Sequence, residues 1–131
     1  MILRATFENI YSIKDETQIS FVAGKSNAHP PHVSRAEKRD DISVLKAGIV
    51  YGANASGKSN VLNAFWFMVN YVLTSHNQQL HKTIERSPFK FDRETPSRPS
   101  SFEVIFTTNG IRYAYGFSVT DKAVIEEYLY Y

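Results

Sequence analysis

The chain has 131 residues, of which 43% are hydrophobic and 21% charged, a composition typical of a globular protein long enough to bury one core. Its formal net charge of +2 gives no argument for binding to nucleic acid or to a membrane surface. The absence of cysteine excludes disulfides and thiolate metal sites and fits a reducing compartment, so we expect a cytoplasmic protein.

Two short strands are predicted near the N-terminus, over residues 2–8 and 18–22. In the first, Leu3, Ala5 and Phe7 alternate with polar residues, which is the pattern of a half-buried strand and not the apolar run of a signal peptide. The two strands are expected to pair as an antiparallel ribbon.

Residues 23–44 change abruptly to loop-forming and charged residues, and we expect a polar surface excursion there. His29 and His32 suggest a metal site, but the two prolines between them and the lack of a third nearby ligand favour a solvated loop. The basic residues at 35, 38 and 39 could contact a phosphate backbone. The aspartates at 40 and 41 instead indicate a solvated run of charges.

The most specific motif lies at residues 52–59, which fit the pattern G-x-x-x-x-G-K-[ST] at every fixed position. Residues 47–51 predict a short buried strand before it and residues 60–73 a helix after it, the context that such a loop requires. A Gly-rich turn with an exposed Lys-Ser pair is the alternative. The predicted phosphate-binding residues are Gly52, Ala53, Asn54, Ala55, Ser56, Gly57, Lys58, Ser59 and Asn60.

The chemistry of such a loop explains its spacing. Glycines let successive backbone N–H groups turn inward around an anion, and the following helix adds the positive end of its dipole. Lys58 would reach the β- and γ-phosphates of ATP, and the hydroxyl of Ser59 would hold Mg²⁺.

The predicted helix over residues 60–73 is apolar around most of its circumference, which suits a helix under a sheet and against another element. Trp66 could stack on a base, but core packing is the favoured interpretation. The stretch is too short to span a bilayer.

Residues 76–100 contain Ser-Pro and Thr-Pro steps that exclude a long helix, and Phe89 and Phe91 predict a short edge strand. His76 and His81 are expected at the surface. From residue 101 to 131, alternating strands separated by Asn109-Gly110 and by residues 120–122 predict an antiparallel meander. The chain is thus expected to be a single ATP-binding lobe over residues 1–131.

This order of a ribbon, a P-loop with its strand and helix, and a meander resembles the first lobe of ABC-type ATPases. More narrowly, residues 6–15 and 49–60 are similar to the SMC/RecF/OLD-like branch, and residues 123–131 resemble AAA/ABC-like ATPases of prokaryotic defence and toxin-like loci. The resemblance covers essentially the whole chain. It implies an α/β fold of the P-loop NTPase class with an antiparallel β meander, ATP and Mg²⁺ as ligands, and a homodimer or partner head that sandwiches the nucleotide.

Two departures from that branch affect the expected activity. Relatives often carry a basic residue just before the serine of the N-terminal turn, where it approaches the γ-phosphate, whereas Tyr11 stands there in this chain. The signature motif, Walker B acid and switch histidine of such ATPases are also missing. Residues 123–127 imitate a Walker B strand, but Glu126 and Glu127 follow a tight turn, as in an antiparallel partner strand, so neither is a convincing catalytic base.

We therefore expect binding of ATP–Mg²⁺ with poor turnover by this chain, and ATPase activity for a longer parent protein of which it is the N-terminal part. A non-catalytic, nucleotide-regulated interaction module is the alternative. A small-molecule kinase is disfavoured because the chain has no Arg-rich lid segment.

Overall fold

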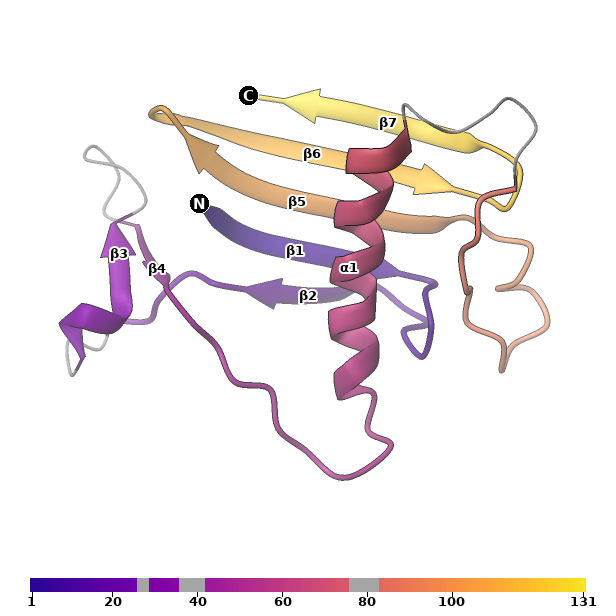
Figure 1. Cartoon of the computed structure of the whole chain (residues 1–131), viewed down its shortest axis with the longest axis horizontal. Helices are drawn as coiled ribbons and strands as arrows, with labels where there is room; N and C mark the ends of the chain where they lie inside the picture. The colour runs from indigo at the N-terminus through magenta and orange to yellow at the C-terminus, as the bar shows by residue number, and fades with distance from the viewer. Residues whose placement is uncertain (26–28, 36–41, 76–82) are drawn as a thin grey trace.

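One antiparallel sheet with a helix across one face forms the body of the molecule (Figure 1). The computed structural model describes residues 1–25, 29–35, 42–75 and 83–131. The five strands follow the order β2-β1-β5-β6-β7, and β3 and β4 form a separate two-stranded sheet. The elements are β1 (Ile2–Glu8), β2 (Thr17–Ser20), the 3-10 helix η1 (Pro30–His32), β3 (Val33–Arg35), β4 (Ser43–Leu45), α1 (Lys58–Thr74), β5 (Ser100–Thr108), β6 (Ile111–Val119) and β7 (Val124–Tyr130).

The predicted ribbon and the predicted meander are both confirmed, and they belong to one sheet. Strand β1 pairs with β2 on one side and with β5 on the other, all antiparallel. This places Phe7, Phe102 and Phe117 side by side in one row across three strands. Because residues in one row of a sheet face the same side, this row supplies a continuous apolar surface for a helix.

Helix α1 covers that row through stacked aromatic rings. The ring of Phe67 lies 5.2 Å from that of Phe102, Phe102 lies 4.9 Å from Phe117, and Tyr71 closes the cluster at 5.2 Å from Phe117. Ala64 is fully buried beside these rings. The cluster fixes how α1 lies on the sheet, since offset stacked rings tolerate little sliding.

The turn predicted at Asn109-Gly110 is confirmed by its backbone angles. Asn109 has φ of 53° and Gly110 φ of 81°, so both central residues are left-handed. This is the combination that a two-residue hairpin with the right strand twist requires, and it explains why Asn-Gly stands there.

The strand predicted over residues 47–51 is not present. This segment is extended chain outside any strand, with Ile49 88% and Tyr51 89% exposed. A strand needs a neighbour for its N–H and C=O groups, and no part of the described chain pairs with this segment. Its apolar composition therefore faces solvent.

Two further predictions are wrong, and others lie partly or wholly outside the described residues. Phe89 and Phe91 form no edge strand, and the ring of Phe91 is 92% exposed. Trp66 is 65% exposed, so the core interpretation is wrong; α1 buries Phe67 and Met68 instead. Within the surface excursion, β3 pairs with β4. The basic and acidic run at residues 35–41 and both His76 and His81 lie wholly or largely outside the described residues.

The connecting loop, residues 83–99, has no strand or helix and is held by polar groups. Asn9 is fully buried, and its Nδ2 donates to the carbonyls of Thr95 (2.7 Å), Arg98 (3.0 Å) and Pro99 (3.0 Å). Its Oδ1 accepts from the N–H of Phe89 at 3.1 Å. The loop is thereby attached to the end of β1.

Arg86 provides a second attachment. Its side chain is buried, its Nε bonds Asp121 Oδ1 at 2.6 Å, and its remaining nitrogens donate to the carbonyls of Pro96 and Arg98 and to the hydroxyl of Ser100. One guanidinium thus joins the connecting loop to the turn between β6 and β7. Its planar fork of donors suits several acceptors at once.

Replacing Asn9 with alanine is expected to destabilise the fold by about 2–4 kcal/mol, because buried carbonyls and one N–H lose their partner. Asn109→Ala is the matched control, since Asn109 has the same φ of 53° but lies at an exposed turn. That change should cost only about 1 kcal/mol, the backbone part of the effect. Urea unfolding of both variants measures the difference. Equal losses would show that the hydrogen bonds of Asn9 contribute nothing.

Candidate functional site

The predicted phosphate loop, residues 52–59 (called the phosphate loop below), leads directly into the first turn of α1 and lies at the surface. Lys58 and Ser59 are the first two helical residues, and Gly57 is the N-cap. No side chain caps this helix end. The first N–H groups of a helix have no partner inside it, so they are free to meet an anion, and the helix dipole favours one.

Gly57 is the residue that the loop geometry requires. Its φ is 91° with ψ of 4°, in the left-handed region where a side chain is strained. A Cβ built there would also lie 3.0 Å from the Oγ of Ser12. Gly57 therefore meets two demands, a turn into the helix and the close approach of another segment.

Ala55 also has a positive φ, of 62°, without being glycine. This conformation costs an L-residue about 1–2 kcal/mol, and such costs concentrate at functional loops. The tip of the phosphate loop is thus held in a shape that the chain does not prefer locally.

Lys58 is folded back over its own loop. Its Nζ donates to the carbonyl oxygens of Gly52 at 2.8 Å and Ala53 at 2.7 Å. The side chain of Lys58 therefore links the end of the loop back to its start. Both bonds are exposed, so an anion can compete for the ammonium group.

The turn between β1 and β2, residues 9–16, forms a second wall beside the phosphate loop. Asn60 Nδ2 donates to Ser12 Oγ at 2.9 Å, which ties the turn to α1. Asn9 and Tyr11 take left-handed φ values of 53° and 52°, and these sharp changes of direction carry Ser12 to the loop. Asn60 was predicted from the sequence to lie at the loop, whereas Ser12 was not.

A cavity of about 510 Å³ lies between this turn and the phosphate loop. Its volume falls in the range of small-molecule sites. The residues that line it are Ser12, Ile13, Lys14, Asp15, Thr17, Val50, Tyr51, Ser56, Gly57, Lys58 and Val61. The members from the N-terminal turn were missed from the sequence because their proximity to residue 57 arises only from the fold. The one sequence signal that could have revealed them is the run of polar residues at 9–16, directly after the first predicted strand.

The predicted loop residues thus lie together, with Ala55 to Asn60 lining a smaller cavity of about 310 Å³ on the loop. Their phosphate contacts remain predictions, as does a Mg²⁺ ligand role for Ser59. The residues fit a phosphate ligand, because uncapped N–H groups, a left-handed glycine and a displaceable ammonium group meet at one helix end.

The two glutamates that imitate a Walker B strand lie elsewhere. Strand β7 is antiparallel to β6 at the edge of the sheet, and Glu127 Oε1 accepts from the hydroxyl of Tyr115 at 2.7 Å. Burial and this bond raise the pKa of Tyr115. The acid that lines the large cavity at the phosphate loop is Asp15. Within the described ranges, no three His, Asp or Glu side chains gather as a metal site.

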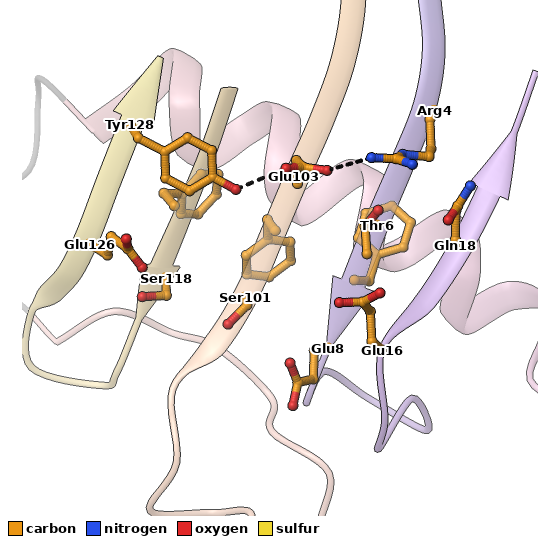
Figure 2. A pocket seen from close by; sticks show the side chains of 13 residues that line it. Arg4, Thr6, Glu8, Glu16, Gln18, Ser101, Glu103, Ser118, Glu126 and Tyr128 are labelled. Carbon is orange, nitrogen blue, oxygen red and sulfur yellow. Dashed lines mark hydrogen bonds and ion pairs between the residues drawn. The ribbon is translucent and has the colours of Figure 1, made fainter. Parts of the chain in front are cut away.

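The face of the sheet opposite α1 carries a polar groove of about 280 Å³ (Figure 2). At its centre Glu103 bonds both Arg4 (3.2 Å) and the hydroxyl of Tyr128 (3.0 Å). The ring of Tyr128 lies over Gly116, so closely that a Cβ on this glycine would fall 2.3 Å from the ring. Burial and the bond to Glu103 raise the pKa of Tyr128 to about 12.

Comparison with known proteins places the chain in a family. A family model described as "AAA domain, putative AbiEii toxin, Type IV TA system" matches residues 49–130, more than half of the chain. The match begins just before the phosphate loop and spans α1 and the strands β5 to β7. The chain therefore belongs to this AAA family, and the match indicates a nucleotide-binding domain of the ATPase type. Neither the curated proteins nor the solved structures gave a match. In the part of the chain that is described, no helix is long and apolar enough to cross a membrane.

Gly57→Ala is expected to lower the free energy of unfolding by about 1–2 kcal/mol and to weaken ATP binding, because the loop must leave its left-handed turn. Gly48→Ala is the matched control: nothing lies within 4 Å of a Cβ at Gly48. This variant should stay within about 0.5 kcal/mol of the parent and bind ATP normally. Calorimetric titration and urea unfolding measure both quantities. Unchanged ATP affinity in Gly57→Ala would contradict the importance of this turn.

Gly116→Ala is expected to destabilise the sheet by about 1–3 kcal/mol, because its methyl group displaces the ring of Tyr128. The same substitution in a Tyr128→Ala background should have little effect, since no ring is there to displace. The coupling is read from urea unfolding of the two single variants and the double variant. Additive losses would mean that the ring does not press on Gly116.

Proposed function

We propose that this chain binds ATP–Mg²⁺ through the phosphate loop, as the nucleotide-binding lobe of an ABC/SMC-like ATPase head. The observation that carries this proposal is the uncapped N-terminus of α1 behind a left-handed Gly57. The membership in an AAA family over residues 49–130 supports nucleotide binding of the ATPase type.

In this function the N–H groups at residues 57–59 bind phosphate oxygens. Lys58 leaves the carbonyls of Gly52 and Ala53 and turns to the β- and γ-phosphates, while the hydroxyl of Ser59 is the Mg²⁺ ligand from this chain. The bound Mg²⁺ would neutralise charge on the phosphates. Asn60 keeps Ser12 against the loop.

Hydrolysis needs a group that orients water and further stabilisation of the transferred phosphoryl group. Asp15 lines the cavity of about 510 Å³ beside the phosphate loop, whereas Glu127, on the edge strand β7, accepts a hydrogen bond from Tyr115. We therefore propose that the water-orienting and charge-stabilising groups come from a longer protein or from a partner head. This chain alone should hydrolyse ATP slowly.

The exposed apolar surface near the phosphate loop supports such a partner. Ile49, Val50 and Tyr51 lead into the loop, and Trp66 and Leu73 lie along the outward side of α1, all exposed. The three consecutive exposed apolar residues at 49–51 support an interface beside the loop, because exposed apolar patches often mark interaction sites. Strands that precede phosphate loops are normally buried in parallel sheets. We propose that segment 47–51 becomes such a strand by pairing with strands of the partner.

A non-catalytic interaction module is the second candidate. It is favoured by the same exposed apolar surface together with the position of Glu127 away from the loop. In that case nucleotide binding stabilises the lobe or changes its partner affinity without turnover. Steady-state phosphate release separates the two candidates once the lobe is joined to its partner.

Lys58→Ala is expected to weaken ATP–Mg²⁺ binding at least about tenfold, because a charge-assisted contact to phosphate is lost. Calorimetric titration measures the affinity, and Lys122→Met, an exposed lysine in the turn after β6, is the control for net charge. An unchanged affinity in Lys58→Ala would refute the proposed function. Hydrolysis by the chain alone that Glu126→Gln abolishes would restore the Walker B interpretation.

A further inference from the structure

Lys14 and Lys58 both line the cavity between the turn after β1 and residues 52–59. Both side chains line the same cavity of about 510 Å³, one from the turn between β1 and β2 and the other from α1. The ammonium group of Lys14, however, bonds Asp92 Oδ2 at 2.7 Å. Asp92 belongs to the connecting loop and is not among the residues that line the cavity.

The two partners of this ion pair differ in mobility. Asp92 is held in place, because its Oδ1 accepts the N–H of Glu94 at 2.9 Å and the backbone of Thr95 also bonds its carboxylate. Lys14 has four rotatable bonds between its backbone and its charge, and its side chain is 42% exposed. The ammonium group can therefore move while the carboxylate stays in place.

The ion pair between Lys14 and Asp92 keeps both side chains charged, but it contributes little free energy that would oppose its replacement by a phosphate contact. The hydrogen bond from Lys14 lowers the pKa of Asp92, and the bond to Asp92 raises the pKa of Lys14, so both are charged near neutral pH. Solvent-exposed ion pairs contribute little net free energy. A doubly charged phosphate oxygen group in the adjacent cavity is a stronger acceptor for an ammonium than one partly hydrated carboxylate.

The cavity also needs a cation at this wall. Asp15 also lines it and would repel a phosphate group there. Lys14 is the basic side chain that the N-terminal turn contributes to the cavity lining. Its ammonium group is paired with Asp92 in this structure.

We propose that Lys14 is a second phosphate-binding cation of this site, held on Asp92 in the nucleotide-free protein and transferred to the terminal phosphate of a bound nucleoside triphosphate. This assignment rests on the proposed nucleotide binding. It makes Asp92 a competitor of the ligand, and it makes the site select for nucleotides with a third phosphate.

Replacing Lys14 and replacing Asp92 should change ATP affinity in opposite directions. An ion pair that only stabilises the turn would lower affinity in both variants. Lys14→Met should weaken ATP–Mg²⁺ binding about tenfold and ADP binding less than about twofold. Asp92→Asn should tighten ATP binding about threefold, because the competitor is neutral. In a Lys14→Met background, Asp92→Asn should have no effect on affinity.

Calorimetric titrations of ATP, ADP and AMP against the whole chain provide these affinities, with urea unfolding to confirm that each variant is folded. Lys14→Arg keeps the charge and should retain ATP affinity within about threefold. Lys122→Met is the control for loss of one exposed positive charge.

Three results would overturn the inference. Equal losses for ATP, ADP and AMP in Lys14→Met would place Lys14 on another part of the nucleotide. Weakened ATP binding in Asp92→Asn would show that the ion pair between Lys14 and Asp92 stabilises the turn instead of competing with the nucleotide. No change in either variant, with binding abolished in Lys58→Ala, would refute this inference and leave the proposed function intact. Binding that survives Lys58→Ala would refute the proposed function itself.

Discussion

The buried amide of Asn9 is the constraint on which both the fold and the site depend. It ends β1 in a left-handed conformation and bonds three carbonyls of the connecting loop. The same change of direction starts the turn that carries Ser12 to Gly57 and Lys14 to Asp92. One side chain thus fixes two segments that are 80 to 90 residues apart in sequence. A buried polar group with all its partners is rigid, because every alternative position leaves some group unpaired.

Helix α1 links the core to the site. Its inward side joins the stack of Phe67, Phe102 and Phe117, which sets the position of the whole helix on the sheet. Its N-terminus is then held beyond the edge of the sheet, where the phosphate loop and the turn after β1 meet (Figure 1). The candidate site itself is exposed, and Lys58 bonds only carbonyl oxygens of its own loop through contacts that a ligand can replace. Rigid core packing behind an adaptable loop is an arrangement that suits ligand binding.

Much of the fold follows from local patterns in the sequence. Alternation predicted β1, β2, β5, β6 and β7, and Asn109-Gly110 predicted the hairpin through its left-handed angles. The strand at residues 47–51 was predicted on the same grounds and is absent, because strand formation depends on a neighbour that local sequence does not supply. Trp66 was misjudged for a related reason. An evenly apolar helix does not reveal which side the sheet will cover, and Phe67 and Met68 took that side.

The sequence by itself predicted the phosphate loop, with glycines at its turns, and the helix behind it, since these depend on residues within one short stretch. Tertiary structure decided the rest of the site. The pairing of β1 with β5 places the N-terminal turn against residues 56–58, and the polar contacts of the connecting loop bring Asp92 to Lys14. Contacts between segments so distant in the chain leave no local pattern, because they arise from how the strands are ordered in the sheet and not from the order of residues within each strand.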